Sequence, residues 1–356
     1  MRAPEERLPT GRFYNDLAVL HHHRERLAAS WQWSLALSVP REEGACEPFV
    51  LLPGCLDEPL LAVGHGGRVR CFSNVCTHRA RLLVDTPGVR SQVRCGYHGR
   101  RFGLDGRCLG APGFEDLPRG APGPEDLPEL GVGTLGPLGF TSVAPEAPWD
   151  ATREALLARL PSLRWTQLQR DPAGQRSFEL RAHWAIYCEN YLEGLHIPYV
   201  HPTLARALDL GRYHTETAPW GVLQVGHHRG EGPALPPDAR APELPVAAYY
   251  MFLFPNTMMN IYPWGVSLNV VTPLALDRTR VDFDAWVWAP ELRGVGAGGD
   301  LDTVEAEDEA VVEAVQKGLR ARLYAGGRYA PGWEDGVRAF HRWLDGAYGP
   351  PLQGEP

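Results

Sequence analysis

The chain has 356 residues, 44% of them hydrophobic, and a formal net charge of −8. A chain of this size buries a large core and is expected to form two domains. The acidic balance and the lack of a long basic run argue against nucleic-acid binding. The longest nearly unbroken apolar run, 246–254, is too short to span a bilayer, and the polar N-terminus does not read as a signal peptide. We therefore expect neither a nucleic acid nor a membrane as partner.

Cysteine usage indicates a reducing compartment. Seven cysteines are an odd number for a disulfide framework, and two of them stand in a metal-binding motif. The others are interpreted as reduced thiols of a cytoplasmic protein: Cys46, Cys55, Cys71, Cys108 and Cys188.

The N-terminal residues 1–39 are predicted to be helical, because Leu17, Leu20 and Leu27 recur at helical spacing. The run His21-His22-His23 lies on this segment. Three adjacent imidazoles suggest metal binding, but on such a segment a solvated helix face is the favoured interpretation.

Short strands separated by Gly and Pro are predicted from about residue 40 to residue 145, which indicates a small β-rich domain. The clearest of them are 49–52, 60–63 and 68–72. The near-repeat Ala-Pro-Gly-x-Glu-Asp-Leu-Pro at 111–118 and 121–128 is interpreted as a linker-like loop, too short for a repeat architecture. A helix at about 150–160 and a strand at 177–180 are expected to open a second domain.

Two loops in the β-rich part carry a metal-binding pattern. They are Cys76-Thr77-His78 and, after sixteen residues, Cys95-Gly96-Tyr97-His98. Each loop supplies one thiolate and one imidazole, a spacing typical of a Rieske [2Fe–2S] cluster, in which both cysteines hold one iron and both histidines the other. The predicted cluster ligands are Cys76, His78, Cys95 and His98. A structural zinc site is the alternative.

A second constellation lies in the run 183–202. Glu193 and His196 share a helix face. His196 and His201 are five residues apart, so an unbroken helix would point them about 140° away from each other. Pro198 is expected to disrupt this helix and let both imidazoles turn inward. With one carboxylate they would form the facial triad of non-haem iron(II) oxygenases.

Helical periodicity indicates which acidic residue could supply the carboxylate of this triad. Residues 301–323 predict an amphipathic helix, and Asp308 falls near the centre of its apolar stripe. By the same periodicity, Glu305, Glu307 and Glu309 fall on the flanks or outside. A carboxylate on a buried stripe is costly unless something pairs with it, and an iron would. A solvated acidic helix start is the alternative, and it explains the glutamates but not Asp308.

These motifs together resemble the α (oxygenase) subunits of Rieske non-haem iron oxygenases, also called aromatic-ring-hydroxylating dioxygenases, over nearly the whole chain. The resemblance implies an α+β fold. N-terminal helices (1–39) that pack on the catalytic domain precede a β-sandwich Rieske domain (40–148). A helix-grip-like catalytic domain with a large antiparallel sheet (149–356) follows, and the run 246–288 fits its strands.

The resemblance also implies the cofactors and partners. A [2Fe–2S] cluster and a mononuclear Fe(II) use O2 as co-substrate. Electrons come from NAD(P)H through a separate flavin/iron–sulfur reductase or a ferredoxin. They pass from a cluster histidine, His78 or His98, to the iron of a neighbouring subunit by way of Glu193, which gives this carboxylate a catalytic role.

Two kinds of departure from the family's pattern bear on this prediction. Gly96 and Arg100 stand where many members have Pro and Trp, which leaves the packing of the second cluster loop open. Ring dioxygenases usually have Asp at the position of Glu193. A Glu there resembles the branch of choline, carnitine and glycine-betaine oxygenases, which are typically homotrimers without a β subunit.

This branch implies a terminal oxygenase that hydroxylates or N-demethylates a small quaternary or methylated amine. Four aromatic residues are candidates for a cage around the ammonium group, although such residues on a sheet also fit a core: Trp220, Tyr250, Tyr262 and Trp264. The alternative is hydroxylation or dioxygenation of an aromatic or heterocyclic acid. A non-catalytic Rieske electron carrier is the remote alternative, since it would not need His196, His201 and Asp308.

Overall fold

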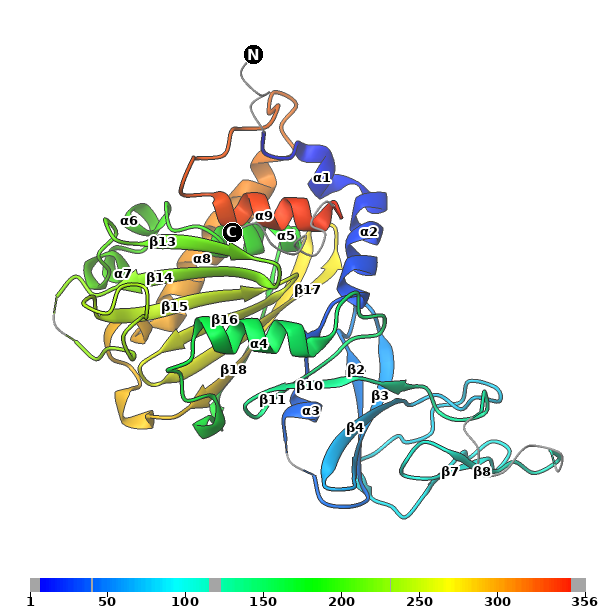
Figure 1. Ribbon diagram of the computed structural model, residues 1–356. Coiled ribbons are helices and arrows are strands. Elements are labelled where there is room, and N and C mark those ends of the chain that lie inside the picture. The colour runs from blue at the N-terminus through cyan, green and yellow to red at the C-terminus, as the bar shows by residue number, and fades with distance from the viewer. Residues whose placement is uncertain (1–6, 40, 115–122, 231, 347–356) are drawn as a thin grey trace, which may run out of the picture. The chain divides into compact units, whose positions relative to one another are not determined.

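The computed structural model describes residues 7–39, 41–114, 123–230 and 232–346. The chain divides into two compact units, one of residues 1–27 and 154–356 and the other of residues 28–153 (Figure 1). The middle of the near-repeat at 111–128 lies outside the described residues.

The unit of residues 28–153 is built almost entirely of short antiparallel strands. Its elements are β1 (Gln32–Trp33), α3 (Leu35–Ser38), β2 (Ala45–Leu51), β3 (Glu58–His65), β4 (Arg68–Ser73), β5 (Gly88–Val89), β6 (Val93–Arg94), β7 (Arg101–Phe102), β8 (Cys108–Gly110), β9 (Glu129–Leu130), β10 (Val132–Leu135) and β11 (Leu138–Thr141). They form a five-stranded sheet, β5-β2-β3-β4-β9, and two three-stranded sheets, β6-β7-β8 and β1-β11-β10. Buried side chains of these strands, with Leu61, Phe72 and Phe102 at the centre, form the core. The strands predicted at 49–52, 60–63 and 68–72 coincide with β2, β3 and β4.

The helices predicted for residues 1–39 end earlier than expected. Of the described residues in this range, Gly11–Asn15 form α1 and Leu17–Ala28 form α2, and after Ala28 the one helix is the single turn of α3. Trp33 in β1 pairs with Phe140 in β11, and this pairing draws the segment after Ala28 into the β-rich unit. Helix α4 (Trp149–Arg159) spans the other boundary between the units along the chain.

The larger unit is organised around one seven-stranded antiparallel sheet. Its strands are β12 (Gln169–Leu180), β13 (His214–Ala218), β14 (Gly221–His227), β15 (Val246–Leu253), β16 (Thr257–Tyr262), β17 (Gly265–Ala275) and β18 (Arg278–Val287). Strands β13 to β18 follow one another in space as in sequence, and β12 pairs with β18 at the far edge. The expected strands at 177–180 and within 246–288 are therefore present.

Helices cover one face of this sheet. They are α5 (Trp184–Tyr191), α6 (Ile197–Val200), α7 (Pro202–Ala207), α8 (Leu301–Gly318) and α9 (Asp335–Leu344), and three short 3-10 turns complete the unit: η1 (Trp165–Gln167), η2 (Pro290–Leu292) and η3 (Gly296–Gly298). Trp184 of α5, Val312 of α8 and Phe340 of α9 pack with Phe252 of β15 in one apolar core. Strands β14, β15 and β16 are buried along their whole length, which fits a sheet covered on both faces.

The histidine run at 21–23 corrects one expectation. His21 and His22 are exposed, but His23 is 1% exposed, because it shares the inward face of α2 with Leu20 and Leu27. Its ring packs against His183, and burial lowers the pKa of His23 to about 3. The interpretation of this run as a solvated helix face was therefore wrong for His23.

Within the described residues, no helix is both long and apolar enough to cross a bilayer.

Candidate metal centres and substrate cavity

The two predicted cluster loops have the same hydrogen-bond frame. In each, the cysteine N–H donates to the carbonyl five residues later, at 2.9 Å for Cys76 and 2.8 Å for Cys95. The N–H four residues later donates back to the cysteine carbonyl, at 3.1 Å in both loops. The residues at that turn, Ala80 and Gly99, have positive φ angles of 54° and 74°. The matched turns present the side chains of both loops toward the same point.

The four predicted cluster ligands come together at this point. Cys76 and Cys95 are buried and their thiols contact each other. The rings of His78 and His98 lie 4.8 Å apart, with His98 exposed. Two buried thiols and two less buried imidazoles fit the donor set of a Rieske cluster, in which the cysteines hold one iron and the histidines the other.

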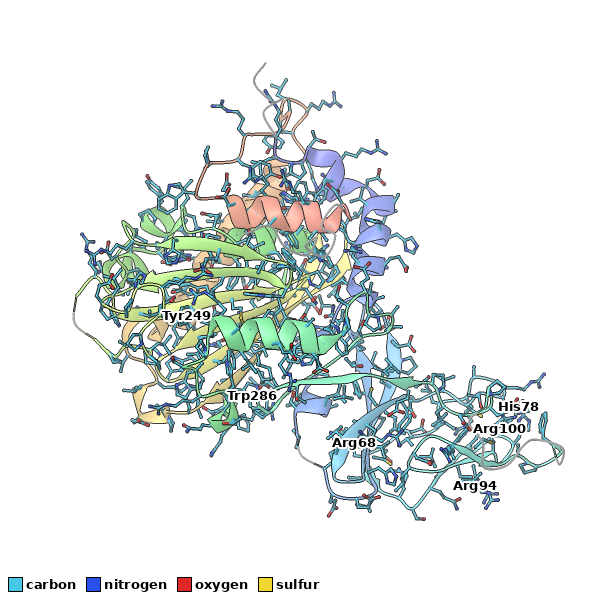
Figure 2. All side chains as sticks on the ribbon, in the orientation of Figure 1. Arg68, His78, Arg94, Arg100, Tyr249 and Trp286 are labelled. Carbon is cyan, nitrogen blue, oxygen red and sulfur yellow. The ribbon has the colours of Figure 1, made fainter. Side chains whose placement is uncertain are left out.

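Arg100, at the position where many family members have Trp, links the two loops. Its guanidinium, only 3% exposed, donates to Oγ1 of Thr77 at 3.0 Å and pairs with Glu125. The same group lies 5.3 Å from the ring of Phe114, which packs edge-on against His78. Figure 2 labels Arg100 and His78 at the same end of this unit. Arg100 therefore fills the position with a buried guanidinium that pairs with the half-buried Glu125.

Gly96, at the position where many members have Pro, makes room for a second arginine. A Cβ added at residue 96 would lie 3.3 Å from Cζ of Arg81, which is a tight contact. The guanidinium of Arg81 donates to the carbonyl of Leu82 in its own loop. Neither departure disturbs the four ligand side chains.

Backbone breaks orient the two histidines of the second constellation. His196 immediately precedes α6, and His201 ends it and precedes α7. The backbone of His201, with φ −116° and ψ 73°, leaves the helical region. Pro198 lies in the first turn of α6, where proline is tolerated. The break that the sequence attributed to Pro198 therefore lies at His201, just before Pro202.

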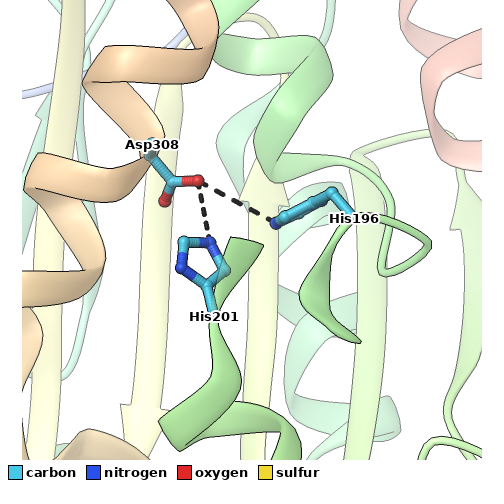
Figure 3. Close-up of side chains that lie close together, drawn as sticks. All are labelled: His196, His201 and Asp308. Carbon is cyan, nitrogen blue, oxygen red and sulfur yellow. Dashed lines mark hydrogen bonds and ion pairs between the residues drawn. The ribbon is translucent and has the colours of Figure 1, made fainter. Parts of the chain in front are cut away.

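His196, His201 and Asp308 converge at one point (Figure 3). Nε2 of His201 lies 2.9 Å from Oδ1 of Asp308, and Nε2 of His196 lies 3.9 Å from the same oxygen. The three candidate ligand atoms are all within 4.8 Å of one another. Asn190 of α5 donates to Oδ1 of Asp308 at 2.6 Å.

Each of these histidines is held from behind by a glutamate. Nδ1 of His196 lies 2.5 Å from Glu193, and Nδ1 of His201 lies 2.7 Å from Glu307. Carboxylates at Nδ1 are typical of metal-bound histidines, because they fix the tautomer that leaves Nε2 free to bind the metal. The sequence predicted the contact of Glu193 but placed Glu307 outside the apolar stripe.

The donor set fits a mononuclear iron. With Nδ1 protonated toward Glu307, a neutral His201 would point the lone pair of Nε2 at the carboxylate of Asp308, an arrangement that is stable only with a cation between them. Burial lowers the pKa of His201, but hydrogen bonds to Asp308 and Glu307 outweigh it, and the pKa is raised overall. Two imidazoles and one carboxylate with open positions are the facial triad of non-haem iron(II) sites.

Glu305 is the main surprise of helix α8. It is 7% exposed, the most buried of the helix's acids, although the apolar periodicity placed it on a flank. The hydroxyl of Tyr187 donates to both of its carboxylate oxygens at 2.8 Å. Burial raises the pKa of Glu305 to about 8, with the nearby charge of Asp308 as a smaller contribution.

A cavity of about 90 Å³ lies beside the triad, enough for a few waters or one small molecule. It is lined by Tyr187, Tyr191, Glu193, His196, Ile197, His201, Leu204, Tyr213, Tyr250, Asn260, Tyr262, Ser267, Asn269, Phe283, Ala297, Leu301, Val304, Glu305 and Asp308. Of the four predicted cage residues, Tyr250 and Tyr262 are among them.

The other two predicted cage residues lie elsewhere. Trp264 is buried, stacks on Tyr262 with ring centroids 5.5 Å apart, and does not line the cavity. Trp220 lies in the turn between β13 and β14 and does not line it either. Both predictions failed because aromatic residues near a sheet edge are often packing residues. Tyr187, Tyr191 and Tyr213, which do line the cavity, were missed.

Two family models match the sequence. The Rieske [2Fe-2S] domain matches residues 52–120, and the ring hydroxylating alpha subunit (catalytic domain) matches residues 170–349, half of the chain. The resemblance predicted from the motifs is confirmed, and so is the presence of a Rieske domain and a catalytic iron domain.

Relatives with known activities are similar over nearly the whole chain. Choline monooxygenase of Beta vulgaris is 29% identical over 370 residues, which cover 96% of this chain and 77% of the relative. The oxygenase subunit of carnitine monooxygenase of Escherichia coli (strain K12) is 26% identical, covering 94% of this chain and 91% of the relative.

Solved structures share the fold. The quaternary ammonium Rieske monooxygenase CntA in complex with L-carnitine has a TM-score of 0.71 at 21% identity, covering 97% of this chain and all of that one. Naphthalene 1,2-dioxygenase from Rhodococcus sp. bound to indole has a TM-score of 0.68 at 18% identity, covering 94% and 93%. The predicted α+β class, with a Rieske domain and a catalytic domain containing an antiparallel sheet, is confirmed.

Proposed function

Since this chain belongs to the ring-hydroxylating oxygenase alpha subunits, we propose that its substrate is a small quaternary or methylated amine that carries a positive charge. The chain is an oxidoreductase, the terminal oxygenase component of a Rieske system. Relatives named for choline and carnitine oxidation support an amine, and the lining of the cavity supports it independently.

The charge of the cavity is the observation that carries this proposal. Three acidic side chains line it, Glu193, Glu305 and Asp308, and no lysine or arginine does so among the described residues. An aromatic acid would bring a further anion to a site with no arginine or lysine to pair with it. An ammonium group would meet carboxylates and the faces of several tyrosines, which attract cations.

The metal groups implied by the family have residues to hold them. Cys76, His78, Cys95 and His98 would hold the [2Fe–2S] cluster, and His196, His201 and Asp308 would hold the iron. When bound, these groups supply electron transfer and the activation of O2.

The surrounding side chains fix the geometry. Glu193 and Glu307 each accept a hydrogen bond from the Nδ1–H of one histidine, so that both Nε2 atoms face Asp308. Asn190 donates to Asp308 and limits the rotation of its carboxylate. Hydroxylation of an N-methyl carbon in this site gives a carbinolamine, which loses formaldehyde. Hydroxylation of a carbon that is not bonded to the nitrogen leaves the C–N bonds intact.

The proposed assembly is a homotrimer that receives electrons from NAD(P)H through a separate reductase or ferredoxin in the cytoplasm. In it, Glu193 connects His196 to a cluster histidine of a neighbouring chain. Two surface features support an interface of this kind. Tyr199, in α6 between His196 and His201, is 82% exposed, and Tyr97, stacked on His98, is also exposed. Such isolated aromatic side chains are common anchors of protein interfaces.

Turnover with a surrogate reductase tests the substrate class. Choline, L-carnitine and γ-butyrobetaine are compared with benzoate for substrate-dependent O2 uptake and for product, including formaldehyde. We expect uptake coupled to product formation with at least one amine and none with benzoate. Coupled turnover of benzoate, with no amine turned over, would contradict the proposal.

A further inference from the structure

We propose that Glu305 is the counter-ion for the ammonium group of the substrate and that it selects cations without a carboxylate of their own. This role rests on the proposed function as an amine oxygenase, and it names the residue that binds the ammonium group.

The carboxylate of Glu305 is buried with little compensation. Its hydrogen-bond donor among the described residues is the single hydroxyl of Tyr187. A carboxylate has about four acceptor positions, so most of them remain free. The charge of Arg176 acts on Glu305, but the ion pair of Arg176 is with Asp302. A buried carboxylate with no cationic partner is costly, and for that reason burial raises the pKa of Glu305 to about 8. A bound cation would favour the ionised form of Glu305 and remove that cost.

The other carboxylates of the cavity are already engaged. Glu193 holds His196, and Asp308 contacts His201 and Asn190. Of the three acids that line the cavity, Glu305 is therefore the one that makes no hydrogen bond to a histidine. It lies one helical turn before Asp308 on α8, so a cation bound by it would sit beside the triad.

The rest of the lining suits a cation that cannot donate hydrogen bonds. A quaternary ammonium group needs negative charge and aromatic faces around its methyl groups. Tyr187 brings a ring to the same carboxylate, and Tyr191, Tyr250 and Tyr262 line the same cavity.

The lining also predicts which cations are excluded. No lysine or arginine of the described residues lines the cavity, so the carboxylate of a betaine would be buried unpaired. Neutral groups are available instead: Asn260, Ser267 and Asn269 suit the hydroxyl of an amino alcohol. The cavity therefore favours a choline-like cation over a carnitine-like zwitterion.

Binding to the metal-loaded protein tests this role without turnover. Titration calorimetry under anaerobic conditions compares three probes: choline, its uncharged carbon analogue 3,3-dimethylbutan-1-ol, and γ-butyrobetaine. In the wild type we expect choline to bind at least about tenfold more tightly than either of the others, which is about 1.4 kcal/mol.

Substitutions locate the effect. Glu305→Gln keeps the shape of the side chain. It should weaken the binding of choline about tenfold or more and leave the affinity for the uncharged analogue unchanged. Glu305→Asp keeps the charge and should retain a preference for choline over the analogue. Glu309→Gln, an acid of the same helix that does not line the cavity, is the matched control and should behave as the wild type.

The outcomes separate the two proposals. Glu305 is not the counter-ion if Glu305→Gln binds choline as tightly as the wild type, or if its affinities for choline and for the analogue fall by the same factor. The proposed amine substrate would stand in either case. If the wild type prefers γ-butyrobetaine to choline, the selection against carboxylates is wrong. If no amine binds the wild type, the proposed function fails and this role fails with it.

Discussion

Oε1 of Glu193 lies 2.5 Å from Nδ1 of His196, three residues further along the chain. The same carboxylate accepts hydrogen bonds from the backbone N–H groups of Leu195 and His196. One side chain thus shapes the turn before α6 and orients the imidazole that faces Asp308. A charge in this position serves both geometry and the proposed electron route.

Glu193→Gln preserves the shape of this turn and removes the charge. Both metal sites should still fill and the cluster should still be reduced. Reoxidation of the reduced cluster by substrate and O2 should slow about 10- to 100-fold, the usual cost of losing such a partner. Stopped-flow absorbance of the cluster measures this rate. Glu43→Gln removes the charge from another glutamate–histidine pair, with His65, and serves as the control. Unchanged reoxidation in Glu193→Gln would remove Glu193 from the route.

The route between chains has its own test. Oligomers mixed from Cys95→Ala chains, which lack the cluster, and His196→Ala chains, which lack the iron, should recover part of the activity. Each chain type supplies the site that the other has lost. Mixed oligomers that are shown to co-assemble and yet stay inactive would mean that electrons do not pass between chains.

Asp308→Ala should remove the mononuclear iron and turnover while leaving the cluster spectrum intact, because the two sites share no ligand. Glu305→Ala should retain the iron, since its carboxylate contacts Tyr187 rather than either histidine. Iron analysis together with the visible spectrum distinguishes these cases. Iron lost from Glu305→Ala and retained in Asp308→Ala would exchange the roles of the two acids.

The buried His23 should destabilise the protein in mild acid. Burial lowers the pKa of His23 from 6.5 to about 3. Between these two pH values the unfolded chain binds a proton on His23 and the folded chain does not. Stability is unaffected above pH 6.5 and falls as the pH decreases below it, by about 2 kcal/mol at about pH 5 for this one group.

His23→Leu removes this proton uptake. The free energy of unfolding from urea titrations at neutral pH and at about pH 5 should differ by about 2 kcal/mol less in the variant than in the wild type. The exposed neighbour gives the control variant, His21→Leu, which should keep the wild-type pH dependence. An equal pH dependence in His23→Leu and the wild type would contradict the buried neutral imidazole.

Arg159 pairs with Glu216 at 2.8 Å and Asp238 at 2.7 Å, all three largely buried. Burial favours a higher pKa for both acids, but the hydrogen bonds and charge of Arg159 lower it overall. Their stabilisation is therefore present above the ordinary carboxyl range and is lost as the pH falls through the lowered pKa values.

Arg159→Met should cost about 3 kcal/mol of unfolding free energy near pH 7, because two buried carboxylates lose a partner. The deficit should shrink in acid, where the carboxylates are protonated in both proteins. Arg12→Met breaks an exposed pair with Asp16 and should cost less than about 1 kcal/mol. A loss in Arg159→Met no larger than that of the control would show that the buried network does not stabilise the fold.

The cluster loops and the iron histidines could be predicted because their ligands lie within short stretches of chain. Cys76 and His78 are two residues apart, and His196 and His201 flank a single turn. Spacing alone then restricts the chemistry. The contact of Glu307 with His201 joins residues 106 apart, and no local spacing signals it.

Helix α8 shows where periodicity fails. Val315 is apolar and yet 41% exposed, whereas Glu305 and Gln316 are buried. Hydrophobic periodicity counts buried polar residues as solvent-facing, so it shifted the stripe away from the true inner face. The prediction for Asp308 was not affected by this shift, because Asp308 lies between the two faces, half-buried beside His201.

The central claim is that one chain holds a Rieske cluster and a separate mononuclear iron. Quantification of iron and acid-labile sulfide in the purified protein tests it most directly. The account predicts three irons and two sulfides per chain in the wild type, and two irons with two sulfides in Asp308→Ala. Zinc in place of iron, or iron without labile sulfide, would contradict it.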